Sequence, residues 1–198
     1  EKQGILWIGT DRGGLNYYNY ETDSFRRFVH DESQKGTISS NITRRIFEDA
    51  NGDLWIGTYP SGVNFHDRST SAISVYLHQK SNPLSLAANL VTDIKEDKQG
   101  NFWVATDGGG PSYFDRKTRT FKNYLIGGDG KEIGSKKMLC GLIDRDGGVW
   151  FGTWDAGVFY YNSATESFEQ LPMDTSQAGG TSAKDVLADT SIWDIYED

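Results

Sequence analysis

Aromatic and charged side chains recur at equivalent places along the chain, and together they could hold a sugar. Tyr59 and Trp154 each follow a threonine that ends a tryptophan-containing motif, and aspartates stand at the same place in two further copies. A planar aromatic ring can cover the apolar face of a sugar, and carboxylate and guanidinium groups can bond its hydroxyls. We therefore expect a ligand-binding surface made from Tyr59, Trp154, Asp155, Arg44, Arg45, Asp93, Trp193, Asp11, Arg12 and Asp107. Any one of these side chains could instead belong to a solvated polar rim, so the prediction concerns the set.

Paired carboxylates raise the alternative of glycosidase chemistry, which needs two such groups at a controlled separation. Glu48-Asp49, Glu96-Asp97 and Glu197-Asp198 recur copy after copy, at the predicted turn between the first two strands of each unit. A catalytic pair should occur once, whereas a repeated pair is typical of turn capping and solvent exposure. We therefore expect no catalytic residues in this chain.

Metal and cofactor chemistry find no support in the residue pattern. Asp49, Asn51 and Asp53 have the spacing that begins a calcium loop, but the later glutamate is missing and the other copies lack the spacing. The three histidines are not predicted to share a face, and the single cysteine, Cys140, has no histidine partner. We expect no metal site, no cofactor and a packed thiol.

The elements that must position these side chains follow from an internal repeat. The motif Trp-Ile-Gly-Thr or a close variant begins at Trp7, Trp55, Trp103 and Trp150, at intervals of 48, 48 and 47 residues. A glycine turn precedes each tryptophan, and a second glycine turn follows before an apolar and aromatic strand. Four short strands and one tryptophan per unit of this length are typical of a β-propeller blade.

We expect an all-β chain of about four blade equivalents, a single β-propeller segment over residues 1–198. The predicted four-stranded blades cover 5–30 (without its innermost strand), 41–78, 89–126 and 136–171, and a lone inner strand covers 191–198. That last strand could complete the first blade and close a small ring without exposed sheet edges. We favour a sector of a larger propeller, of the seven-bladed type, because four-bladed rings lie at the low limit. Segment 172–190, rich in Gly, Ser, Thr and Ala, is predicted to be a mobile loop.

The turn after the second strand and the start of the innermost strand should meet on one face around the propeller axis. Several blades converge there and form a concave mouth with variable side chains. The four motif tryptophans should instead fill the space between stacked blades. Asn16 and Asn64 are predicted to hold their turns through their side chains, whereas for Asn41 and Asn89 both roles, turn or mouth, stay open.

The repeat resembles a known family. The second copy reads Glu48-Asp49-x-x-Gly52-x-Leu54-Trp55-Ile56-Gly57-Thr58 and then Gly62-Val63-Asn64, a pattern similar to the two-component regulator propeller repeat. Leu6–Thr10 with Gly13–Tyr17 matches that repeat nearly residue for residue. The third and fourth copies depart from it at Ala105, Pro111-Ser112 and Phe159, which warns that not every blade presents the same surface.

The resemblance implies a function. Such propellers form the periplasmic sensor region of hybrid histidine kinases of the Bacteroidetes type, the extracytoplasmic part of an inner-membrane protein that passes a carbohydrate signal to a cytoplasmic kinase. It implies an oligosaccharide ligand, contact with neighbouring blades or a second propeller, and a homodimer in the full-length protein. A protein-interaction or dimerisation scaffold without a small-molecule ligand is the alternative, and a lyase or hydrolase propeller is a third.

The charge balance argues against anionic partners. The 20 basic and 28 acidic residues give a formal net charge of −8, which would repel phosphate backbones and anionic membranes. We therefore expect no nucleic-acid partner. No run approaches the roughly 18 apolar residues of a membrane-spanning helix, and the chain opens in the middle of a repeat, as expected of a piece of a longer protein.

Overall fold

The computed structural model describes residues 5–124, 135–173, 186–187 and 189–198, and every regular element among them is a β-strand. These ranges contain no helix, and hence none of the length and apolar character needed to cross a membrane. Most of the predicted loop 172–190 lies outside the described residues. The strands are β1 (Ile5–Gly9), β2 (Leu15–Asn19), β3 (Ser24–Phe28), β4 (Thr43–Glu48), β5 (Leu54–Thr58), β6 (Val63–Asp67), β7 (Ala72–Tyr76), β8 (Val91–Glu96), β9 (Phe102–Thr106), β10 (Gly110–Asp115), β11 (Thr120–Asn123), β12 (Met138–Ile143), β13 (Val149–Thr153), β14 (Val158–Asn162) and β15 (Ser167–Gln170).

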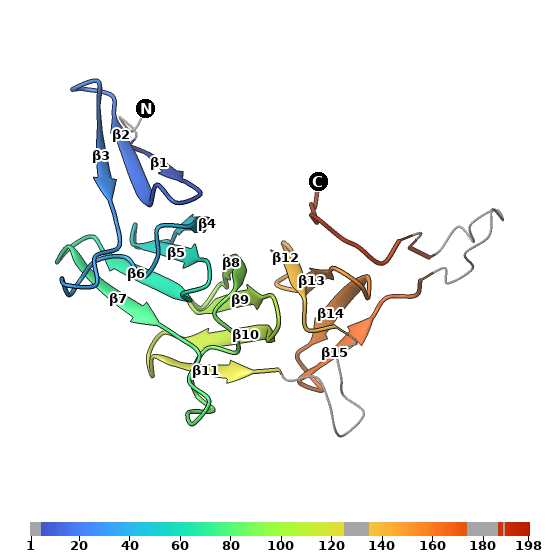
Figure 1. Ribbon diagram of the computed structural model, residues 1–198. Coiled ribbons are helices and arrows are strands. Elements are labelled where there is room, and N and C mark those ends of the chain that lie inside the picture. The colour runs from blue at the N-terminus through green and yellow to red at the C-terminus, as the bar shows by residue number, and fades with distance from the viewer. Residues whose placement is uncertain (1–4, 125–134, 174–185, 188) are drawn as a thin grey trace.

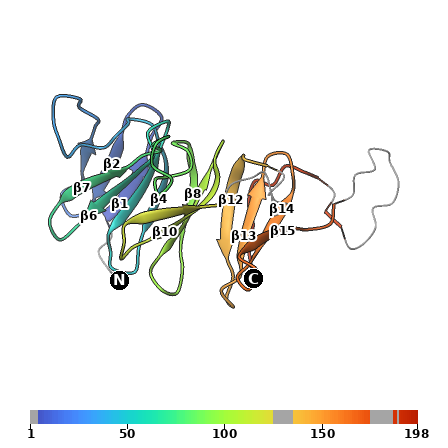
Figure 2. The same ribbon diagram turned by 90° about the horizontal axis from the view of Figure 1, so that it is seen from below.

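Each repeat forms one antiparallel sheet. Within the described ranges, the first sheet has the order β1-β2-β3, and the second, third and fourth sheets hold β4 to β7, β8 to β11 and β12 to β15 in sequence order. Figure 1 shows the four sheets following one another along an arc, with β4, β8 and β12 on its inner side. Viewed from below, the sheets stand side by side (Figure 2). This arrangement confirms the predicted propeller architecture.

The motif glycine allows the first and second sheets to approach the inner strand of the next sheet. A Cβ atom added at Gly57 would lie 2.8 Å from Cγ1 of Val91, and one added at Gly9 would lie 2.8 Å from Cγ2 of Thr43. Real side chains do not tolerate such distances, so glycine is required where β4 and β8 lie against the preceding sheet.

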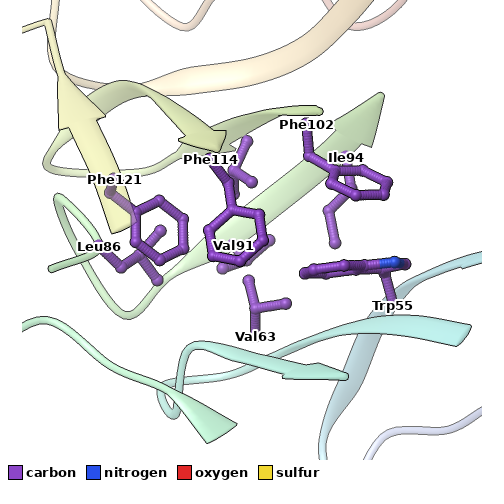
Figure 3. Packing of buried hydrophobic residues seen from close by; sticks show 9 residues of the cluster. Trp55, Val63, Leu86, Val91, Ile94, Phe102, Phe114 and Phe121 are labelled. Carbon is purple, nitrogen blue, oxygen red and sulfur yellow. The ribbon is translucent and has the colours of Figure 1, made fainter. Parts of the chain in front are cut away.

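Large aromatic rings fill the space between the second and third sheets. Figure 3 shows Trp55 of β5 facing Phe102 and Phe114, and its ring centroid lies 4.1 Å and 5.3 Å from theirs. All three side chains are at most 1% exposed. Trp103 is the equivalent residue at the next junction, where it packs against Phe151 and Phe159 in a second buried cluster.

The predicted core position is confirmed for Trp55 and Trp103, but Trp7 and Trp150 are only half-buried. Trp7 packs against the cluster between the first and second sheets without being enclosed by it. Trp150 alternates with Phe151 along β13 and therefore points away from the third sheet. Its ring contacts Tyr160, on the same far face, at 4.5 Å between centroids.

A buried carboxylate joins the second and third sheets at the end opposite the motif glycine. Asp49 is 5% exposed and accepts hydrogen bonds from Nε1 of Trp55 at 2.9 Å and from the backbone N–H groups of Asn51 and Asp53. Arg116 of the third repeat completes the site with an ion pair to Asp49. We call this group the arginine clamp (Asp49, Trp55 and Arg116). It neutralises a carboxylate that burial would otherwise penalise.

The structure does not form the inner strand predicted over 191–198. The segment is extended. It lies along the fourth sheet in the way that β4 lies along the first sheet and β8 along the second, and the N–H of Ile192 donates to the carbonyl of Thr153 at 2.8 Å. A Cβ atom at Gly152 would lie 2.7 Å from Cγ2 of Ile192, which repeats the contact between Gly57 and Val91. No described strand pairs with the segment, so the hydrogen-bonded ladder that defines a strand is missing.

The first sheet likewise has three strands in the described part of the chain, and β1 pairs there with β2 alone. The segment 191–198 does not complete it, so the four units form an open sector and the alternative of a closed four-bladed ring is wrong for this chain.

The arginine clamp makes a stability prediction. We expect Asp49→Asn to lower the free energy of unfolding by about 2 kcal/mol, because the amide can still accept the turn hydrogen bonds but removes the closest carboxylate partner of Arg116, which keeps only Glu96 at 3.6 Å and Asp53 at 3.8 Å. Urea denaturation measures the loss. Asp97→Asn is the matched control, since Asp97 is the equivalent residue of the third repeat and Ser163 stands at the place of Arg116. Equal losses at the two positions would show that the clamp contributes nothing.

Candidate functional site

The turn after the second strand of each sheet lies beside the start of the inner strand. Thr58 at the end of β5 pairs with Thr43 at the start of β4, and the N–H of Tyr59 donates to the carbonyl of Ile42 at 3.0 Å. In the fourth sheet, the N–H of Trp154 donates to the carbonyl of Lys137 at 3.0 Å. Antiparallel pairing dictates this arrangement, because it places the end of one strand beside the start of its neighbour. We call the resulting face the mouth (residues 42–44, 59, 90–92, 107, 137–139, 154 and 193).

Arg44 and Tyr59 meet at one side of the mouth. Cζ of Arg44 lies 5.5 Å from the centroid of the Tyr59 ring, which is within range of a cation–π contact. Tyr59 is 42% exposed, so part of its ring is accessible to a ligand. The two side chains border a cavity of about 280 Å³. The residues that line it are Arg44, Tyr59, Leu90, Val91, Thr92, Asp107, Leu139 and Trp193.

Trp154 and Trp193 meet at the other side of the mouth. Their ring centroids are 5.2 Å apart at an interplanar angle of 81°, an edge-to-face contact. They are 44% and 68% exposed. Trp154 lines an adjoining cavity of about 310 Å³ together with Asp107, Lys137 and Leu139. Asp107 and Leu139 border both cavities, so the two cavities adjoin where three sheets meet.

Two of the predicted site residues contact each other instead of lining the mouth. Nε of Arg45 lies 2.7 Å from Oδ1 of Asp93, and Nζ of Lys95 lies 3.3 Å from Oδ2. The same Oδ2 accepts a hydrogen bond from the N–H of Gly141 at 3.0 Å. Asp93 is 5% exposed. Its carboxylate therefore joins the second, third and fourth sheets and borders neither cavity.

The other predicted residues lie at the edge of the mouth or beyond it. Asp155 follows Trp154, and its Oδ2 is 3.4 Å from Nζ of Lys137; both side chains are about half exposed, which makes this a weak surface pair. Asp11 and Arg12 are exposed in the equivalent turn of the first sheet and border neither cavity.

The structure adds five residues to the mouth: Leu90, Val91, Thr92, Lys137 and Leu139. Thr92 and Leu139 occupy in their repeats the position that Arg44 and Trp193 occupy in theirs. The repeat alignment alone therefore points to them. Their small or apolar side chains carry no chemical signal for a binding site, so residue type did not suggest them.

The conserved positions of asparagine within the repeat are structural. Oδ1 of Asn41 and Oδ1 of Asn89 accept hydrogen bonds from the backbone N–H groups of His30 and His78, each at 2.7 Å. Asn64 is fully buried, and its Oδ1 accepts a hydrogen bond from the N–H of Ser39 at 2.8 Å. The open question about Asn41 and Asn89 is thus decided against the mouth. Asn64 has a structural role, but its strongest bonds go to Ser39 in the segment before β4 and not, as predicted, to its own turn.

The described residues add neither a reactive thiol nor a metal-binding cluster to the mouth. Cys140 is buried, and burial raises the pKa of its thiol to about 11, so the thiol stays protonated at neutral pH. Across the described ranges, no group of three His, Cys, Asp or Glu residues could hold a metal ion. The mouth offers exposed aromatic faces, one carboxylate and two cationic side chains. This set can bind a neutral polyhydroxylated ligand by stacking and hydrogen bonding.

Placement of the tryptophans makes a spectroscopic prediction. We expect the double variant Trp154→Phe with Trp193→Phe to lose much of the fluorescence intensity that acrylamide quenches, because these two rings are exposed; the half-buried Trp7 and Trp150 should contribute the remainder. Trp55→Phe is the matched control and should leave the quenchable intensity unchanged, because Trp55 is buried. A quenchable intensity in the double variant equal to that of the parent chain would contradict the placement of the mouth aromatics.

Comparison with known proteins supports the resemblance seen in the repeat. Residues 36–59 and 85–108 match the family model described as the two component regulator propeller. These segments include the motifs at Trp55 and Trp103. None of the curated proteins matches the chain.

Three solved structures are similar to the chain. The extracellular domain of a protein described as a hybrid two component system from B. thetaiotaomicron superposes with a TM-score of 0.71 at 22% identity, over 100% of this chain and 30% of that one. A second such extracellular domain from the same organism gives 0.67 at 28% identity, over 88% of this chain and 24% of that one. Virginiamycin B lyase from Staphylococcus aureus gives 0.65 at 12% identity, over 89% and 54% of the two chains.

The chain thus spans less than a third of either extracellular domain. The lyase shares the fold alone, and it shows that this fold also serves enzymes. The sequence match and the two extracellular domains agree on one assignment. Segments 36–59 and 85–108 are two-component regulator propeller repeats, and the whole chain has the propeller fold of the extracellular domains of hybrid two component systems.

Proposed function

We propose that the mouth binds an oligosaccharide. The observation that carries the proposal is the exposed pair of Trp154 and Trp193 beside Asp107, at two adjoining cavities of which one is also lined by Arg44 and Tyr59. One tryptophan of an edge-to-face pair keeps a free ring face, on which the apolar side of a sugar can stack. Asp107, Arg44 and Lys137 can then bond the hydroxyl groups.

The repeats and the similar extracellular domains support a place for this chain outside the cytoplasm. In this proposal the chain is part of the non-catalytic, ligand-sensing region of a hybrid two-component system anchored in the inner membrane. Its full-length protein passes the signal to a cytoplasmic histidine kinase, through contacts with further blades, a second propeller or a second copy in a homodimer.

The position of the mouth supports coupling between binding and the arrangement of the sheets. Arg44 and Tyr59 belong to the second repeat, Asp107 to the third and Trp154 to the fourth. A ligand that touches all three favours one arrangement of these sheets over others. The ligand can shift the equilibrium between these arrangements only by the difference between its binding free energies for them.

The test is a thermal-shift screen of the chain against plant and host oligosaccharides, with titration of any sugar that raises the melting temperature. We expect a saturable rise with a sugar of one class, since a ligand at 100 times its Kd stabilises the native state by about 2.7 kcal/mol. Trp154→Ala and Tyr59→Ala should each weaken that sugar at least about tenfold, because each removes a stacking surface.

Asp11→Ala is the matched control, because Asp11 occupies the same turn position in the first sheet outside the cavities. It should bind like the parent chain. Equal binding by the parent chain and the Trp154 and Tyr59 variants would place the sugar elsewhere. No rise with any sugar would contradict the proposal for this chain and would favour the scaffold alternative, which loss of self-association in the same mouth variants would then support.

A further inference from the structure

A groove of about 660 Å³ opens at the junction of the third and fourth sheets, on the outer side of their contact and remote from the mouth residues. Its size is within the range of small-ligand sites. At the junction it is bordered by Asp97, Trp103, Tyr113, Tyr124, Tyr161 and Ser163, and it continues past the 144–148 turn to Trp150.

The same place in the preceding junction is filled by a guanidinium group. Arg116 reaches from the third repeat to Asp49 of the second, and its Cζ lies 5.3 Å from the centroid of Phe102. The repeats align Arg116 with Ser163 and Asp49 with Asp97. The fourth repeat therefore lacks the side chain that would reach back to Asp97, and both Ser163 and Asp97 border the groove.

The carboxylate that an arginine at position 163 would have met is retained. Asp97 is half-buried, whereas Asp49 beneath its arginine is 5% exposed. Oδ2 of Asp97 accepts a hydrogen bond from the hydroxyl of Tyr113 at 2.8 Å, and Nδ2 of Asn101 donates to that hydroxyl at 2.8 Å. Burial and the bond to Asp97 raise the pKa of Tyr113 well above its usual range, so the hydroxyl stays a donor.

The other partners of the clamp arginine have changed, and aromatic rings replace them. Glu96 and Phe102, which face Arg116, correspond to Ile143 and Val149 in the fourth repeat. In their stead the groove has a wall in which Trp103 lies 4.9 Å from Tyr113, 5.2 Å from Tyr124 and 4.8 Å from Tyr161 between ring centroids.

The charge of the groove is negative. Its lining residues carry four carboxylates, from Asp97, Asp144, Asp146 and Glu166, and one ammonium group, that of Lys122, which is paired with Glu166 at 2.6 Å. A planar cation gains both from a carboxylate and from aromatic faces, and guanidinium combines the two more readily than ammonium.

We propose that this groove binds the guanidinium group of an external ligand, which occupies the place that Arg116 takes at the preceding junction. Asp97 accepts its N–H donors, and the wall of Trp103, Tyr113, Tyr124 and Tyr161 provides the ring faces. The ligand is either a free small molecule that carries guanidinium or an arginine side chain of a protein partner. The site is independent of the sugar proposed for the mouth.

The test is calorimetric titration of the chain with two probes and one isostere. N-acetyl-arginine amide represents a protein side chain, free arginine represents a small molecule, and N-acetyl-citrulline amide has the same shape as the first without the charge. We expect one or both arginine probes to bind at least about tenfold more tightly than the citrulline probe, since a hydrogen bond to a charged group is worth that factor or more. The tighter of the two arginine probes identifies the source of the ligand.

Ser163→Arg is the decisive variant, because it supplies the missing guanidinium from within, as Arg116 does. It should fold at least as stably as the parent chain and reduce binding of the arginine probes at least about tenfold. Asp97→Asn should also reduce binding of the arginine probes at least about tenfold while leaving the fold intact. Trp154→Ala at the mouth should leave binding of the arginine probes unchanged. Equal binding of the arginine and citrulline probes, or unchanged binding in a folded Ser163→Arg variant, would overturn the proposal.

Discussion

A sheet of three or four strands of about five residues cannot bury both of its faces by itself, and the whole structure follows from this constraint. Each repeat presents aromatic side chains on the face that meets the next sheet, as Trp55 meets Phe102 and Phe114. Close stacking at the first two junctions in turn requires the motif glycine, since a side chain at Gly57 would collide with Val91, whereas Ala105 occupies this position in the third repeat. The tryptophan and the glycine of the motif therefore both serve the packing of one sheet on the next. The tryptophan fills the space between the sheets, and the glycine allows their backbones to approach.

The junctions share this core and differ at their edges, and the differences create the two candidate sites. At the mouth, the same repeat position carries Arg44, Thr92, Leu139 or Trp193, so its cavities are lined by unlike side chains on equivalent backbone. At the opposite end, Arg116 closes one junction, while Ser163 leaves the next one open beside a retained carboxylate. Repetition thus provides a scaffold in which a few substitutions at the edge of a junction open a cavity without altering the sheets.

The fold could be predicted from the sequence because four copies of one motif have to form the same strands, so an uncertain assignment in one copy is resolved by the others. Four copies of one motif gave the strand order, the core tryptophans at 55 and 103, and the end of the sheets where the mouth lies. The half-burial of Trp7 and Trp150 could not be read in this way, because it depends on which face has a neighbour. The strand predicted over 191–198 failed for a similar reason: strand formation needs a partner, and the sequence pattern describes only one side of the pair.

The site was predicted in part. Arg44, Tyr59, Asp107, Trp154 and Trp193 come together as expected, whereas Arg45 and Asp93 pair with each other across a junction. Neighbouring residues of one strand can point to different surroundings, and a bulge at the start of β4 alters the alternation there. Whether such a side chain contacts solvent or a partner depends on where the next sheet lies.

The Asp93 carboxylate makes three sheets mechanically interdependent. It contacts Arg45 on one neighbour and the backbone of Gly141 on the other, so rotation of either sheet must break an ion pair or a hydrogen bond. The contact therefore favours one relative position of the three sheets. Any movement of one sheet against its neighbours that separates these atoms costs a charge-assisted bond of the buried Asp93 carboxylate.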